Sequence, residues 1–146
     1  MEKVIRTISL PYSAEQMFKI VNNVAAYPEF LPWCDSTNVM SESAYEMIAE
    51  VTISKVGVRQ TFKTRNHLIQ GQRIEMHLIE GPFKKLHGVW EFEDLPEGGC
   101  EIRFGVKFEA MTSLLNAAIT PIFSGFANSM IDSLGHRAKM LYGAAI

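Results

Sequence analysis

The residues best suited to chemistry in this chain are its histidines, cysteines and carboxylates, and their spacing is poor for catalysis. The four histidines lack the spacing along a helix that metal ligands require: His67, His77, His87 and His136. Two of them, His77 and His87, fall on the solvent side of adjacent predicted strands, near Arg65 or Glu75. Plain surface histidines are the expected outcome there, and a pH-sensitive or adventitious cluster is the alternative. The sequence therefore predicts no metal site.

The two cysteines, Cys34 and Cys100, have no CxxC partner, so reduced thiols are expected. Cys34 stands beside Trp33 in an apolar segment, which favours a buried thiol over a nucleophile. The sequence contains no phosphate loop, dinucleotide fingerprint or nucleophile elbow. We also find no acid–base pair, so we predict a protein that is not an enzyme and holds no cofactor.

Large apolar side chains recur at positions that a sheet and a helix would turn toward each other. Their spacing alone predicts that they form a packed core. If the packing leaves space between them, that space would form a cavity for a hydrophobic ligand. The candidate cavity residues are Trp33, Phe62, Met76, Phe83, Leu86, Trp90, Phe104, Phe108, Ile119, Phe123, Phe126 and Met130. Polar groups that could orient a ligand's head group are Asn66, Asn128 and Ser129.

Residues 27–34 read Tyr-Pro-Glu-Phe-Leu-Pro-Trp-Cys, with three aromatic residues, two prolines and one charge. Proline interrupts both helices and strands, so we expect an irregular loop. An apolar loop must fold back onto apolar surface. It therefore either plugs one end of the core or forms the rim of a pocket.

The net charge of −2 conceals an uneven distribution. Residues 55–87 hold seven Lys and Arg against two Glu, so this stretch carries +5 and the remainder carries −7. Its candidate basic face consists of Arg59, Lys63, Arg65, Lys84 and Lys85. Such a face could bind RNA phosphates, could dock on anionic lipid headgroups, or could be a solvated surface without a partner.

The length of 146 residues predicts one domain, residues 1–146. The N-terminus runs directly into an alternating pattern without the apolar core of a signal peptide, so we expect a cytoplasmic protein. No run approaches the roughly 20 apolar residues of a membrane span, so any membrane contact would be peripheral.

Alternating polar and apolar residues predict antiparallel strands covered on one side. In the first strand, Val4, Ile8 and Leu10 alternate with Arg6 and Ser9. Later strands are predicted at residues 45–54, 58–69, 74–78, 86–93 and 101–109. Short turns separate them, so the strands should form a meander.

Helix signals occur at both ends of this strand-rich region. Ser13 and Gln16 form a capping box that starts a short helix. Near the C-terminus, Thr120 is the expected N-cap and Pro121 the first residue of a main helix over residues 121–142. Residues 114–119 would then form a separate short helix or turn.

Five blocks of sequence resemble, in order, the START-like or helix-grip superfamily: residues 11–17, 27–34, 60–66, 81–86 and 127–130. Within it, the chain is similar to the polyketide-cyclase-like branch that contains coenzyme Q-binding proteins and the bacterial ribosome association toxin (RatA) family. The resemblance implies an α+β fold in which a curved antiparallel sheet of six to seven strands wraps around a long C-terminal helix. One or two short helices would follow the first strand.

The same resemblance implies two roles, neither of which is enzymatic turnover. The first is binding of ubiquinone or an isoprenoid precursor in support of respiration, with the 27–33 loop and the 81–83 turn as gates. The alternative is a ribosome association toxin that binds the large ribosomal subunit and blocks 70S formation.

Overall fold

A computed structural model describes residues 2–55 and 57–143 of the chain. Seven strands form one antiparallel sheet in the order β1-β7-β6-β5-β4-β3-β2. The strands are β1 (Glu2–Leu10), β2 (Cys34–Glu42), β3 (Glu46–Lys55), β4 (Val58–Ile69), β5 (Arg73–Glu80), β6 (Phe83–Asp94) and β7 (Cys100–Ala110). The helices are α1 (Ala14–Asn22), the 3-10 turn η1 (Val24–Ala26), α2 (Tyr27–Phe30) and α3 (Ser113–Tyr142).

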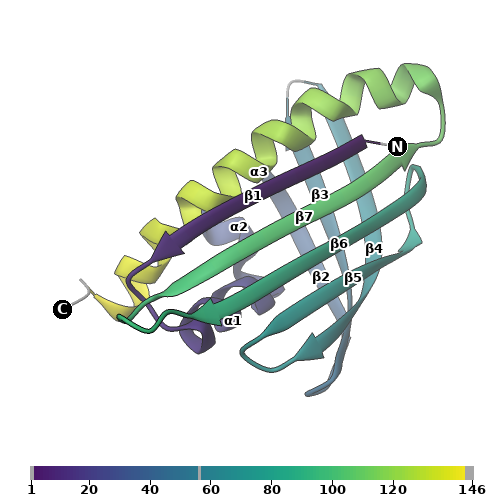
Figure 1. The fold of residues 1–146 in the computed structure, drawn as a ribbon. Coiled ribbons are helices and arrows are strands. Elements are labelled where there is room, and N and C mark those ends of the chain that lie inside the picture. Colours follow the sequence, from purple (N-terminus) through teal and green to yellow (C-terminus); the bar gives the residue numbers. More distant parts are fainter. Residues whose placement is uncertain (1, 56, 144–146) are drawn as a thin grey trace.

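The sheet curves around α3, which runs along its inner side, while α1 and α2 lie toward one end of the sheet (Figure 1). Strands β3 to β7 form the predicted meander, β2 adds one strand that the sequence analysis did not locate, and β1 pairs with β7, the strand farthest from it in sequence. The α+β helix-grip arrangement expected from the sequence is confirmed.

Each central strand has an inner and an outer face, as its alternating sequence predicts. In β7, Ile102 and Phe108 are buried on the inner face, whereas Arg103 and Lys107 are exposed on the outer face. The inner rows of the strands, the buried side of α1 with η1 and α2, and one stripe of α3 form two apolar clusters that together make the core. Hydrophobic burial between the sheet and this helix therefore stabilises the whole arrangement.

The C-terminal helix differs from the prediction because it is continuous from Ser113 to Tyr142 with Pro121 inside it. Its N-cap is Thr112, whose side chain accepts a hydrogen bond from the Leu115 amide, and Thr120 is an interior residue. Pro121 is exposed, so the carbonyl that loses its helical donor faces outward, where water can replace that donor. The expected break at residue 120 is therefore wrong.

Two further local expectations need correction. Arg6 shares the inner face of β1 with Val4 and Ile8, because all three are at even positions of a period-two strand. Tyr27–Phe30 is one short turn of helix, because Pro28 lies in its first turn, where a missing N–H costs nothing. The capping box of Ser13 and Gln16 is confirmed.

By length and composition, α3 is apolar enough to cross a bilayer, which the sequence analysis did not anticipate. In the fold its apolar stripe is turned toward the sheet. The buried residues of this stripe recur every three or four positions, as one helix face requires: Ile119, Phe123, Phe126, Ala127, Met130, Leu134 and Ala138.

We predict that Leu134→Ala lowers the free energy of unfolding by about 2–5 kcal/mol, because it leaves a cavity in a fully packed site. Leu134 is 0% exposed, whereas Leu114 on the same helix is 84% exposed. Leu114→Ala is therefore the matched control and should change stability by less than about 0.5 kcal/mol. Urea denaturation of both variants checks the prediction. Equal effects would show that α3 does not pack on the sheet by this stripe.

Candidate functional site

Two adjacent cavities lie on the inner face of the sheet, the first beneath α3 and the second beneath α1, η1, α2 and Met130 of α3. The first has a volume of about 100 Å³ and the second about 120 Å³. They share five wall residues: Trp33, Phe62, Met76, Phe104 and Met130. Both are small beside the 300–1,000 Å³ of ordinary ligand pockets. In this conformation the site has room for a compact group, and a longer ligand requires wall residues to move.

Most predicted cavity residues lie on these walls. The first cavity adds Leu86, Phe123 and Phe126 to the shared five, and the second adds Trp90. The other three predicted residues, Phe83, Phe108 and Ile119, are not on either wall and belong to a packed cluster around Phe123. The Phe108 and Phe83 rings lie 4.7 and 5.5 Å from the Phe123 ring, so they support the wall from behind.

Sequence reasoning missed several wall residues. Ile53, Val106 and Ala127 line the first cavity, and Asn22 and Thr64 line the second. The apolar three lie on the inner faces of predicted strands and of the helix, so their parity was a usable signal. Asn22 could not be found in this way, because an asparagine at the end of a helix is common and does not indicate a cavity wall.

The second cavity has polar residues in its wall. Thr64 and Asn66 are buried there, and the Thr64 hydroxyl donates to Asn66 Oδ1 over 2.8 Å. Trp33 Nε1 and Asn22 Oδ1 are buried without a hydrogen-bond partner among the described residues. An unpaired buried polar group costs roughly 1–3 kcal/mol. Trp33 and Asn22 both line the second cavity, so its wall residues include an unpaired N–H donor and an unpaired carbonyl acceptor.

The other two predicted head-group contacts lie outside the cavities. Asn128 is exposed, and its Oδ1 accepts a hydrogen bond of 2.6 Å from Arg6 Nε. Ser129 lines neither cavity wall. Asn66 is thus the one predicted head-group residue that the structure brings to the site.

Trp33 closes one side of the site. Its ring stacks on the Phe126 ring, with 4.7 Å between the two centroids. Lys55 Nζ lies 5.9 Å from the centroid of the same Phe126 ring. Trp33 follows the α2 turn and lies just before β2, so the 27–34 segment folds back onto the core. The sequence suggested that this segment either plugs one end of the core or forms the rim of a pocket. In the structure the same segment does both.

The predicted basic residues of β4 are paired with carboxylates. Arg59 lies 2.5 Å from Asp35, and Lys63 lies 3.6 Å from Glu80. Arg65 Nε lies 3.7 Å from Glu46 Oε2. These ion pairs neutralise much of the field that the sequence predicted along β4. Lys84 and Lys85 are exposed at the start of β6.

A different line of basic side chains crosses the outer face of the sheet, from β1 to β4. Strand register places them directly opposite one another. This basic row consists of Lys3, Lys107, His87, His77 and Arg65. Lys3 and Lys107 are exposed and form no ion pair with any described residue. Like charges directly opposite each other destabilise a sheet, so the Lys3–Lys107 pair is a cost to folding.

The two thiols are not activated. Cys34 and Cys100 are free and buried, as expected of Cys34 from its apolar surroundings. Burial raises the pKa of the Cys34 thiol to about 11, and Asp35 adds to the shift. Burial raises the pKa of Cys100 to about 11 as well, with a smaller effect from Asp94. Both are therefore neutral thiols near pH 7, unlike a catalytic thiolate.

A curved antiparallel sheet gripping one long helix, with an apolar cavity between them, defines a START-like protein. The chain belongs to the polyketide cyclase / dehydrase and lipid transport family, whose sequence profile matches residues 10–134. A START superfamily protein from Mycobacterium smegmatis has the same fold, with a TM-score of 0.81 at 16% identity over 95% of this chain and 98% of that one.

Two relatives have names that state a function. The chain is 46% identical to the ribosome association toxin RatA of Pseudomonas aeruginosa over 138 residues, which is 94% of this chain and 96% of that protein. It is 27% identical to the mitochondrial coenzyme Q-binding protein COQ10 homolog B of Xenopus laevis over 138 residues, or 92% of this chain and 57% of that protein. Neither name describes an enzyme.

We predict that iodoacetamide leaves both thiols of the folded protein largely unmodified at pH 8, because their pKa values of about 11 keep them protonated and burial excludes the reagent. Both should react quickly in urea. Mass spectrometry of the alkylated protein at successive times measures each rate. Fast labelling of native Cys34 would contradict the thiol environment described above.

Proposed function

We propose that the protein binds the ribosome through the outer face of its sheet, with the basic row in contact with RNA phosphates. The observation that carries this proposal is the near full-length similarity to a ribosome association toxin. Blocking of subunit joining by occupation of the large subunit is the mechanism that the resemblance suggests for this contact.

The placement of the basic row supports this choice of surface. The strands that carry it are neighbours in one sheet, about 4.8 Å apart, so five basic side chains extend across roughly 20 Å. A phosphate backbone bound there would relieve the repulsion between Lys3 and Lys107. Within the row, Lys3 and Lys107 have no carboxylate partner among the described residues, whereas Arg65 is paired with Glu46 and both histidines contact Glu75. Arg59 and Lys63 of the predicted face are also paired with carboxylates.

We propose, as a second function, that the inner cavities hold an aromatic head group with an apolar tail, such as ubiquinone or a phenolic precursor. The observation that favours this function is the pair of unpartnered polar atoms in an otherwise apolar site. A ring carbonyl of a quinone would accept from Trp33 Nε1, and a ring hydroxyl of a phenolic precursor would donate to Asn22 Oδ1.

The cavity volumes limit how such a ligand binds. A head group matches the scale of the combined cavities, while an isoprenoid tail needs additional space. Met76 and Met130 line both cavities, and their flexible side chains can rearrange around a tail. Each buried CH₂ of the tail would add about 0.8 kcal/mol to binding.

For the ribosome contact, we expect that the double variant Lys3→Gln/Lys107→Gln loses most of its co-sedimentation with large ribosomal subunits. The slope of log affinity against log salt should become shallower by about 1.5, as expected for two lost phosphate contacts. The matched control is Arg59→Gln/Lys63→Gln, which removes the same charge from the paired face and should retain binding. If the control variant lost binding while Lys3→Gln/Lys107→Gln retained it, the contact would lie on β4. If both variants bound as the unmodified protein does, the proposed surface would be refuted.

For the cavity, we predict that a short-chain ubiquinone quenches tryptophan fluorescence saturably, and that Trp33→Phe weakens its binding about five- to tenfold through one lost hydrogen bond. Trp90 on the same wall remains as the reporter. Thermal stability without ligand should change little, because lost packing is offset by removal of an unpaired donor. Ala127→Leu, which fills the first cavity, should also weaken binding. Absence of saturable quenching in the unmodified protein would refute this function.

A further inference from the structure

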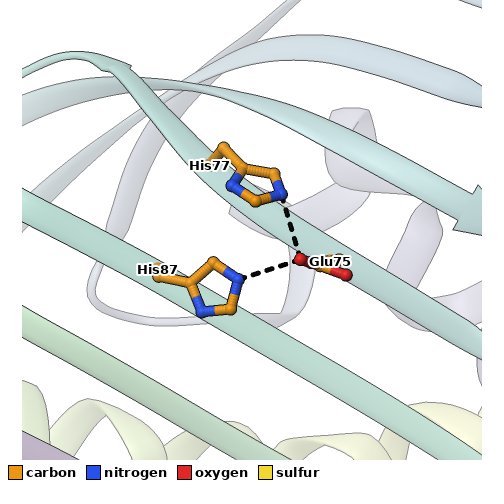
Figure 2. Close-up of side chains that lie close together, drawn as sticks. All are labelled: Glu75, His77 and His87. Carbon is orange, nitrogen blue, oxygen red and sulfur yellow. Dashed lines mark hydrogen bonds and ion pairs between the residues drawn. The ribbon is translucent and has the colours of Figure 1, made fainter.

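Three side chains on the outer face of the sheet converge on one point. His77 Nε2 and His87 Nε2 each lie 3.1 Å from the same oxygen, Oε1 of Glu75 (Figure 2). Glu75 and His77 come from β5 and His87 from β6. One ligand atom from each of the three lies within 4.8 Å of the other two.

These separations resemble the edges of a metal coordination shell. Zinc binds imidazole nitrogen at about 2.0–2.1 Å and carboxylate oxygen at about 2.0–2.2 Å, so neighbouring ligands of a tetrahedral site are about 3.3 Å apart. The two nitrogen–oxygen distances in the cluster are already close to that value. A cation can therefore replace the hydrogen-bonding protons with only small rotations of the side chains.

We propose that Glu75, His77 and His87 form a binding site for one divalent transition-metal ion of the zinc class. The two imidazoles and the carboxylate would supply three ligands, and water would complete the coordination. This proposal does not depend on either function proposed above. Two imidazoles and one carboxylate favour such an ion over Mg²⁺ or Ca²⁺, which prefer oxygen ligands.

The sheet holds the three residues in place before any ion arrives. Glu75 and His77 are two positions apart on one strand, so they share a face. His87 is directly opposite His77 in the register of β5 and β6, both of which are interior strands. The side chains are 31–44% exposed, so an ion and its waters can reach them.

Other charged and titratable groups surround the site. Arg73 Nη2 lies 3.3 Å from Glu75 Oε2 and Arg73 Nη1 lies 3.5 Å from Glu91, so it competes for the carboxylate. In register with the cluster lie further groups on the neighbouring strands: Arg65 and His67 on β4 and Lys107 on β7. This positive surrounding weakens cation binding, so we expect a reversible site that exchanges its ion with solution.

The Glu75 carboxylate is available as a ligand. Its pKa lies below the ordinary value, first because His87 hydrogen-bonds to it and further because of Arg73 and His77. The carboxylate therefore stays ionised near neutral pH. The sequence analysis predicted no metal site because it considered ligand spacing along a helix, whereas here two strands in register bring the ligands together.

The test uses the full chain without ribosomes or quinone, titrated with Zn²⁺ and followed by calorimetry and by two-dimensional amide NMR. We expect one Zn²⁺ per chain, with chemical-shift changes centred on residues 73–79 and 85–91. His77→Gln, His87→Gln and Glu75→Gln should each weaken binding roughly tenfold or more, because even outer-shell changes cost that much. Mg²⁺ should not produce these shifts.

His136→Gln is the matched control, because His136 is an exposed histidine on α3, away from the cluster. It should bind Zn²⁺ as the unmodified protein does. Circular dichroism of each variant verifies that it remains folded. Equal affinity in all four variants, or shifts that do not saturate, would overturn the proposal and leave the cluster as a hydrogen-bonded group only.

Discussion

The structure depends on the burial of one sheet face beneath its helices, with α3 along its length and α1 at one end. Apart from the mostly exposed edge strand β2, the strands turn an apolar row inward, and one stripe of α3 packs over that surface along its length. A curved sheet and one long helix do not match perfectly, so packing is tight in some places and leaves small cavities in others. The inner face can therefore receive a ligand while the outer face stays open for a macromolecule or an ion.

Local patterns were sufficient to predict most of this architecture. Period-two alternation located the strands, and the parity of residues such as Phe62, Met76 and Phe104 placed them on the cavity wall. The capping box at Ser13 fixed the start of α1. These inferences succeeded because each depends on neighbours only a few residues apart in sequence.

The inferences that failed, or that could not be made, depend on tertiary contacts. Helix α3 continues through Pro121 because packing on the sheet outweighs one lost hydrogen bond. Asn128 was placed toward the ligand, but it lies on the exposed side of α3 and bonds Arg6. The alignment of Lys3 with Lys107 requires knowing that β1 pairs with β7. No local pattern contains that information.

The pairing of β1 with β7 also determines the order in which the molecule can be completed. The first strand leaves the ribosome early, yet its only partner ends at Ala110. During synthesis the N-terminal segment must wait unpaired while about a hundred further residues emerge. A nascent copy therefore cannot assemble its complete outer surface until β7 has been translated, and a product truncated before β7 would lack the Lys3–Lys107 junction.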